Sequence, residues 1–435
     1  MASVEQVARW TSKLSGPLID RILKALSSSK KTHNFIKHLE RKRIRSIQNL
    51  KRILIIPDIN IGDAVLTQSF ISPLKKAFPH LDLSYVYQHR AGPLVQANPH
   101  INHHFPLFKA LGFPSEEDRR NLIKLIVQHD FDLIFNFSPY FSKNMFKHSS
   151  SKVIYPLRFI GNVIQAYASE SQKAQIVFQM NRFANELLEE ISPEIKFTPN
   201  PNFSGPFLYA TEQLFQKTQR TLESLNIKPH TCKVFFNPDT SSSYTFIPFP
   251  FQLALLKGLL SQDNITLIMN RGFVFKDIEK KLIQALPSPL REKVMVIPGN
   301  TPIDVYAGLT DHWDVFISGD TAPLHLAAAK KIIVDSGQKF RNSTAVIGIF
   351  GATSGKIYGY DSFSSGYLPS SQDAPARAFE GSPSCKNLTC IDKIFKNCPE
   401  IRCFKGLKPA EVIDYIRGRF SFWEAETRTD GDVRD

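Results

Sequence analysis

The feature that most constrains this 435-residue chain is an alternation of short apolar runs with stretches of helical periodicity, which occurs twice along the sequence. In the first round, apolar runs at Ile53–Pro57, Leu81–Tyr87 and Phe131–Phe137 alternate with helical patterns at Ala64–Phe78 and Glu116–Gln128. Strands that alternate with helices form parallel sheets, because each helix returns the chain to the end of the sheet where the previous strand began. We therefore expect an α/β fold.

A second round of the same alternation follows a segment rich in Pro, Asn and Gly at Pro193–Pro206, which predicts a linker. Later, the Ser-, Gly- and Pro-rich stretch Tyr358–Pro383 predicts a surface loop, and Pro409–Phe422 predicts a final helix. The other elements expected in this round are strands at Lys233–Asn237, Ile265–Met269, Val294–Ile297, Val315–Ser318 and Ala345–Phe350, and helices at Phe249–Leu260, Asp277–Leu286 and from about Thr321.

Two rounds of alternation predict two Rossmann-like domains that face a central cleft. We place the N-terminal domain at 51–194, the linker at 195–207, and the C-terminal domain, with a cysteine-rich loop and the final helix, at 208–435. Residues 1–50 precede both domains and predict a basic helical extension, because their apolar residues recur at helical spacing.

Most of the net charge of +14 lies in this extension, since thirteen Lys and Arg but only three Asp and Glu occur up to Arg52. Two interpretations stay open. The helices could pack on the following domain with a solvated basic face, or that face could dock on the anionic inner surface of the cytoplasmic membrane. Nucleic acid is not an expected partner, because no aromatic-interleaved basic motif and no zinc-finger spacing accompanies the charge.

The sequence also argues against secretion and membrane spanning. Its apolar runs are far shorter than the roughly 20 residues that a membrane-spanning helix needs. The first sixteen residues contain Glu5, Arg9 and Lys13 without the apolar core of a signal peptide. Five cysteines are too few for a disulfide scaffold in a chain of this length. We expect a cytoplasmic protein.

The loop after the first strand carries the first candidate site residue. In open α/β sheets ligands bind beyond the carboxyl ends of the strands, and there Gly62 and Asp63 begin a helix. Gly62 allows a ligand or the other domain to approach the backbone closely. Asp63 either faces the cleft or is only a helix cap. A dehydrogenase is a poor fit, because the G-x-G-x-x-G fingerprint is absent.

The corresponding loop of the second domain gives a stronger signal. Amides at the start of its helix, at Thr321 and Ala322, suit a diphosphate, because they carry the positive end of the helix dipole. Thr321 adds a hydroxyl, Asp320 can accept a hydrogen bond from a sugar hydroxyl, and His325 lies one turn further. The alternative is that Asp320 and Thr321 only cap the helix and His325 is a core histidine.

Two further groups of residues leave alternatives open. The loop with Thr240 and Ser241 either binds phosphate through its hydroxyls or is an ordinary serine-rich turn. A C-x4-C-x7-C-x4-C cluster either holds zinc or iron as a structural clip, or contains reduced cysteines or transient disulfides. Its members are Cys385, Cys390, Cys398 and Cys403, whereas the lone Cys232 is expected in the core.

Together these motifs resemble the heptosyltransferases of glycosyltransferase family 9, which build the inner core of lipopolysaccharide. The resemblance covers about Arg52–Arg417. The matching motifs are G-D-x-x-L-T at Gly62–Thr67, the pair Asn98-Pro99, N-P-x-x-S at Asn237–Ser241, D-[ST]-G-x-x-H-L-A-A-A at Asp320–Ala329 with Ala322 in place of the glycine, and F-G-x-T-S at Phe350–Ser354.

The resemblance implies a GT-B fold, with acceptor binding in the N-terminal domain and nucleotide-sugar binding in the C-terminal domain. It implies an inverting transfer, typically from ADP-heptose to a lipid-linked lipopolysaccharide-core acceptor, and no metal or cofactor is required for catalysis. Asp63 matches the general base. Thr240, Ser241, Asp320, Thr321, Ala322 and His325 match donor-binding positions. A protein O-heptosyltransferase or a non-catalytic nucleotide-sugar-binding assembly protein are the alternatives.

The chain departs from the family at positions that face the donor. Thr245 occupies the place of a lysine that offsets phosphate charge, Ile247 that of a tryptophan, and Ala322 that of a glycine. Arg271, Lys276 or a basic residue of the other domain is expected to replace the lysine. Extra length before the last strand includes Asp335–Asn342. These departures leave the identity of the donor open.

Overall fold

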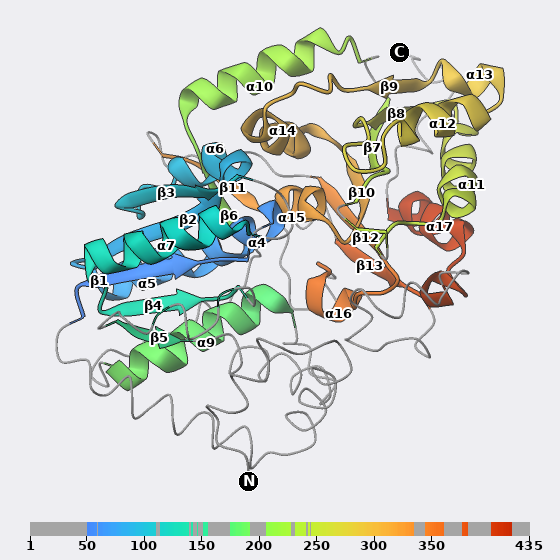
Figure 1. Cartoon of the computed structure of the whole chain (residues 1–435). Coiled ribbons are helices and arrows are strands. Elements are labelled where there is room, and N and C mark those ends of the chain that lie inside the picture. The colour runs from blue at the N-terminus through green and yellow to red at the C-terminus, as the bar shows by residue number, and fades with distance from the viewer. Residues whose placement is uncertain are drawn as a thin grey trace, which may run out of the picture.

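The structure is a computed structural model, and it contains two parallel β-sheets, each with helices on both faces (Figure 1). The predicted N-terminal extension at 1–50 lies outside the described residues except for Leu50, as does most of the linker. The structure describes residues 50–58, 60–109, 114–138, 141, 146, 151–154, 175–191, 206–227, 231–240, 242–243, 245–334, 344–360, 376–381 and 402–419.

The first sheet has five parallel strands in the order β3-β2-β1-β4-β5. β1 lies at its centre, and the chain first builds the sheet toward β3 and then returns to the other side of β1 with β4. The switch in direction therefore falls between β1 and β4, where open sheets bind ligands. The strands are β1 (Arg52–Ile56), β2 (Asp82–Gln88), β3 (His103–Phe108), β4 (Leu133–Asn136) and β5 (Lys152–Ile154).

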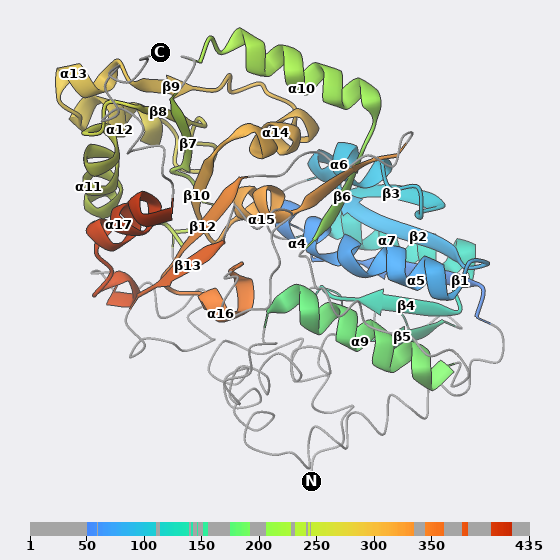
Figure 2. The ribbon, with the colours of Figure 1, turned by 180° about the vertical axis from the view of Figure 1, so that it is seen from behind.

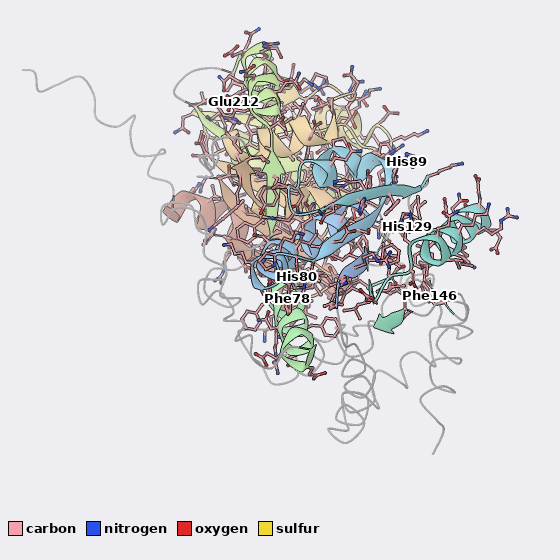
Figure 3. The ribbon with its side chains drawn as sticks, turned by 90° about the vertical axis from the view of Figure 1, so that its left-hand side faces the viewer. Phe78, His80, His89, His129, Phe146 and Glu212 are labelled. Carbon is pink, nitrogen blue, oxygen red and sulfur yellow. The ribbon has the colours of Figure 1, made fainter. Side chains whose placement is uncertain are left out.

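Both faces of β1 are buried, as the unbroken apolar run predicts for a central parallel strand. Ile53 and Ile55 pack with α5 and α9, whereas Leu54 and Ile56 point to the opposite face and pack with α7. α7 ends at His129 (Figure 3). The His129 ring stacks on that of Phe131, just before β4. The helical segments of this half are α4 (Ile61–Thr67), η1 (Gln68–Phe70), α5 (Ile71–Ala77), η2 (His89–Ala91), α6 (Gly92–Gln96), α7 (Glu116–His129) and α9 (Ile176–Ile191).

The second sheet has six parallel strands in the order β13-β12-β10-β7-β8-β9. Val234 and Phe236 of β7 pack with α11, α12 and α17 on one face, and Phe235 packs with α14 and α15 on the other. Phe235 also stacks on Phe316 with ring centroids 5.0 Å apart. The strands are β7 (Cys232–Asn237), β8 (Ile265–Met269), β9 (Val294–Val296), β10 (Val315–Gly319), β12 (Ala345–Phe350) and β13 (Arg377–Glu380). The helical segments are α10 (Glu212–Ser224), α11 (Phe249–Leu260), α12 (Ile278–Ala285), α13 (Ser288–Arg291), α14 (Ile303–Leu309), η4 (Thr310–His312), α15 (Ala322–Ala328), α16 (Gly355–Tyr358), η7 (Arg402–Phe404) and α17 (Pro409–Arg419).

A separate pair of parallel strands, β6 (Phe207–Ala210) and β11 (Lys330–Ile333), links the two halves. β11 follows α15 of the second half, while Tyr209 of β6 makes an edge contact with the ring of His100 in the first half, 5.5 Å between centroids. The sequence analysis missed this pair. Both sheets fall within the ranges expected for the two domains, whose bounds stay a prediction.

The prediction of a loop over Tyr358–Pro383 is wrong in part. Arg377–Glu380 forms β13, which pairs in parallel with β12 at the edge of the sheet. This strand has only four residues and two of them are charged, so its own sequence gives no strand signal, and the ladder with β12 stabilises it. Before it, α16 ends at Tyr358, and Ile357 of that helix packs in the core of the first half.

Candidate active site

Asp63 lies in the first turn of α4, directly after the central strand β1. The residue that caps this helix is Asn60, so the interpretation of Asp63 as the N-cap is wrong. The Asn60 side-chain amide instead donates to Asp63 Oδ2 over 3.3 Å. The Asp63 side chain is therefore available for chemistry, because it is not used to close the end of the helix.

Two buried hydroxyls hold α4 in place. Thr67 Oγ1 donates to the carbonyl of Asp63 over 2.8 Å and is also hydrogen-bonded to the hydroxyl of Tyr85. Tyr85, from the neighbouring strand β2, is fully buried, and its single hydroxyl hydrogen goes either to Thr67 Oγ1 or to the carbonyl of Ala64, which is 3.2 Å away. These contacts hold the backbone carbonyls of Asp63 and Ala64 in place. Thr67 is the last residue of the predicted G-D-x-x-L-T motif, whereas no pattern in the sequence indicates Tyr85.

In the second half, Asp320 and His325 lie side by side at the end of β10. His325 Nδ1 is 2.8 Å from the Tyr360 hydroxyl, and Nε2 is 3.7 Å from Asp320 Oδ1. The imidazole is 6% exposed and the carboxylate 14% exposed. Thr321 occupies the N-cap position of α15, but its hydroxyl makes no capping hydrogen bond. The capping interpretation thus fails for the Thr321 side chain, and His325 faces Asp320 as well as the protein interior.

The two halves meet where α4 and α15 lie against each other, as Figures 1 and 2 both show. A methyl group at Gly62 would lie 3.0 Å from His325 Cδ2 and 3.5 Å from Ala322 Cα. Of the two partners expected to approach the backbone at Gly62, a ligand or the other domain, the structure shows the other half of the molecule there. Because α4 follows β1 and α15 follows β10, the carboxyl ends of the two central strands face one another, and Asp63 and His325 share one junction.

Burial shifts the pKa values of three titratable groups at this junction, those of Asp63, Asp320 and His325. It raises the pKa of Asp63 to about 8, reinforced by the charges of Asp58 and Asp320 and opposed by the hydrogen bond from Asn60. Burial also raises the pKa of Asp320 to about 6, against the effect of Thr353, and lowers the pKa of His325 to about 4. At neutral pH, Asp320 is thus mostly ionised, His325 is neutral, and Asp63 is mostly protonated, so that its carboxylate becomes available as a base toward pH 8.

Comparison of the sequence with protein-family models and with curated proteins finds no match. Comparison of the structure with solved structures finds matches over most of the chain. A family 9 glycosyl transferase from Veillonella parvula has a TM-score of 0.58 at 16% identity, over 86% of this chain and 98% of that one. The E. coli ADP-heptose lipopolysaccharide heptosyltransferase II has a TM-score of 0.54 at 14% identity, over 87% of this chain and 100% of that one. The E. coli heptosyltransferase WaaC with ADP has a TM-score of 0.50 at 12% identity, over 85% of this chain and 100% of that one.

The chain has the GT-B fold of these proteins. In this GT-B chain, Asp63 comes from the first half and Asp320, Thr321, Ala322 and His325 from the second, so the structure brings together five of the seven residues predicted as catalytic or donor-binding.

The loop after β7 contains the two remaining predicted donor-binding residues, Thr240 and Ser241, whose role in phosphate binding stays a prediction. Thr240 is 4% exposed, and its hydroxyl is hydrogen-bonded to that of Thr245, which also donates to the carbonyl of Ser242 over 3.2 Å. The hydroxyl of Thr240 thus makes its hydrogen bond inside the loop, to Thr245, the residue at the expected lysine position. Ser241 lies outside the described residues.

The four-cysteine cluster stays a prediction. Cys385, Cys390 and Cys398 lie outside the described residues, and Cys403 is buried at 7% exposure beside Phe404. Over the described ranges, no group of three or more His, Cys, Asp or Glu is placed to hold a metal ion. Cys232 is buried in the core as expected, and burial raises the pKa of its thiol to about 12.

Proposed function

We propose that this protein is an inverting glycosyltransferase that uses a nucleotide-activated sugar, with ADP-heptose as the first candidate donor and a lipid-linked lipopolysaccharide-core glycan as the candidate acceptor. The observation that carries the proposal is the junction of α4 and α15. A carboxyl group with a raised pKa from one half lies there against the donor-motif residues of the other half. The GT-B fold supports the same proposal.

In the proposed reaction, Asp63 acts as the general base. Its carboxylate takes the proton from an acceptor hydroxyl as that oxygen attacks the anomeric carbon of the donor. The bond from the anomeric carbon to the phosphate oxygen breaks, its electron pair leaves with the nucleoside diphosphate, and the configuration inverts. The raised pKa suits this role, because a carboxylate with a pKa of about 8 is a far stronger base than an ordinary one.

The second half would hold the donor. Ionised Asp320 would accept hydrogen bonds from sugar hydroxyls. When the Tyr360 hydroxyl donates to Nδ1 of His325, Nε2 carries the hydrogen and is 3.7 Å from Asp320 Oδ1, so His325 would orient that carboxylate. The amides of Thr321 and Ala322 would face the leaving phosphate, since Pro323 has no amide hydrogen. The proposal requires no metal.

A membrane-surface partner belongs to the same proposal. In the part of the chain that the structure describes, no helix has both the length and the apolar character needed to cross a bilayer. We propose that the protein acts in the cytoplasm and that residues 1–50, with their excess of Lys and Arg, dock on the anionic inner face of the membrane where a lipid-linked acceptor lies.

The test has two stages. A melting-temperature screen across ADP-, UDP- and GDP-sugars identifies the donor, because a ligand that binds the native state raises its stability. Release of the nucleoside diphosphate is then measured with a Kdo-lipid A acceptor and with folded polypeptide acceptors. The proposal predicts release that Asp63→Ala abolishes while the circular dichroism spectrum stays unchanged. Turnover that survives in this variant would remove Asp63 from the mechanism, and donor binding without turnover on any acceptor would favour the assembly-protein alternative.

A further inference from the structure

The position at which the resemblance implies a lysine facing the diphosphate carries no cation in this chain. Thr245 stands at the lysine position, and its hydroxyl is hydrogen-bonded to Thr240 and to the carbonyl of Ser242. Arg271 is directed elsewhere, because its side chain covers Gly299, where an added methyl group would lie 2.8 Å from Arg271 Cδ. Besides Lys276, the replacements expected from the sequence are therefore basic residues of the other half.

Arg90 of the first half reaches across to the second half. It lies in η2, directly after β2, and its guanidinium carbon is 4.3 Å from the ring centroid of Phe273 in the loop after β8. The Arg90 backbone is held by the side chain of Gln88, which accepts its N–H over 2.9 Å. Among the described residues, no carboxylate forms an ion pair with Arg90. Stacking uses only the face of a guanidinium, so its in-plane N–H donors stay available for an anion.

The loop that carries Phe273 is rigidly attached to the donor side. The carboxylate of Asp239, which is 7% exposed, accepts the backbone N–H groups of Phe273, of Val274 over 2.8 Å and of Phe275 over 3.0 Å. Glu279 accepts the N–H of Gly272 over 2.9 Å. Asp239 immediately precedes Thr240 in the loop after β7. The backbone of this loop is thus held at the carboxyl ends of β7 and β8, and Arg90 meets the 56% exposed Phe273 side chain from the carboxyl end of β2, on the edges where both sheets present their ligands.

We propose that Arg90 is the cation that contacts the diphosphate of the nucleotide-sugar donor and replaces the lysine absent at Thr245. This inference rests on the proposed function. A guanidinium matches two phosphate oxygens in a bidentate geometry, so Arg90 can bind the anion while Phe273 supports its face. Because Arg90 belongs to the half that carries Asp63, a diphosphate held by the second half would also bind the first half. Binding of the donor would then fix the position of the base.

The experiment measures dissociation constants by titration calorimetry. The ligands are whichever of ADP, UDP and GDP the wild type binds most tightly, and the nucleoside with the same base. Arg90→Gln is expected to raise the dissociation constant of the nucleoside diphosphate by about ten- to a hundredfold, the range for a lost charge-assisted hydrogen bond. The dissociation constant of the nucleoside is expected to change by less than about twofold. Arg90→Lys is expected to recover part of the loss, and Phe273→Leu to reproduce a smaller part of it.

Arg52→Gln is the matched control. Arg52 is an exposed arginine at the opposite, amino end of the same sheet, where its partner Asp130 is 3.8 Å away. The role of Arg90 would be overturned if Arg90→Gln lost equal affinity for the diphosphate and the nucleoside, or if its affinities equalled those of Arg52→Gln. Either result would leave the proposed transferase activity standing. A wild type that binds no nucleoside diphosphate would overturn the proposed function as well, and the two failures are thereby distinguished.

Discussion

The two short helices at the junction occupy equivalent places in the two halves and differ in chemistry. α4 and α15 each have seven residues and each follow a central strand, with an aspartate at or just before the start. Asp63 has a pKa of about 8, beside Asp58 and Asp320. Asp320 has a pKa of about 6. Two carboxyl groups whose pKa values are pushed apart can take different roles, and the comparison assigns proton transfer to Asp63 and hydroxyl binding to Asp320.

The largest expected effect separates these two roles. Asp63→Asn keeps the shape of the side chain but removes the base, so kcat is expected to fall by about 10²- to 10⁴-fold with little change in donor affinity. Asp320→Asn is expected to raise the KM for the donor, because it removes an ionised acceptor of sugar hydroxyls. Steady-state kinetics of nucleotide release checks both variants. A similar fall in kcat in both, with donor KM unchanged, would mean that the comparison assigns the roles wrongly.

The raised pKa of Asp63 also predicts a pH-dependent stability. Folded Asp63 keeps its proton between pH 3.8 and about 8, where the unfolded chain has lost it. Because the unfolded state binds fewer protons in this window, the free energy of unfolding falls as the pH rises. Asp63→Asn is expected to remove this part of the fall, on the order of 4 kcal/mol, in urea unfolding at pH 5 and pH 8. Parallel curves for the two proteins would show that burial does not shift this group.

The close contact of the helices is tested at Gly62. A methyl group there would lie 3.0 Å from the ring of His325, which Tyr360 holds in place, so the ring or the helix must shift by a few tenths of an ångström. We expect Gly62→Ala to lower the free energy of unfolding by about 1–2 kcal/mol. Gly418→Ala in α17 is the matched control, because a methyl group there has nothing within 4 Å and alanine favours a helix. Equal stability of the two variants would indicate that α4 and α15 do not touch.

The smallest effect concerns the hydroxyl that holds His325. Tyr360→Phe removes the hydrogen bond to Nδ1 but keeps the ring, so a loss of about 1 kcal/mol in stability is expected. The donor KM should rise modestly while kcat per bound donor stays near that of the wild type. A kcat effect as large as that of Asp63→Asn would instead place His325 in the chemical step.

The sequence predicts the central elements of the fold well and its edges poorly. Ile265–Met269 and Ala345–Phe350 are strands with the predicted bounds, because unbroken apolar runs are buried on both faces of a parallel sheet. β11 and β13 were missed. Lys330–Ile333 and Arg377–Glu380 carry charged residues, and pairing with β6 and β12 holds them in the sheet. Such pairing depends on partners distant in the sequence and has no local signal.

The candidate site shows the same division. The motifs were sufficient to name Asp63 and His325, since helix starts after central strands gather at one edge. They gave no indication of Tyr85 or Tyr360, which reach the site from other elements. The interaction of Asp58 with Asp63 depends on how the loop after β1 folds. Contacts that tune a pKa therefore needed the structure, whereas the identity of the acid and the histidine did not.

The most direct test of the central claim is the pH profile of kcat/KM for the wild type and for Asp58→Asn, because this profile reports the pKa of the free enzyme's base. For the wild type we expect a rising limb whose midpoint lies near pH 8, and for the variant, which lacks the neighbouring charge, a midpoint at lower pH. Asp320, His325 and Tyr85 also face Asp63, and the variant leaves them unchanged. A limb near pH 4, or one that Asp58→Asn does not move, would contradict the assignment of Asp63 as the base.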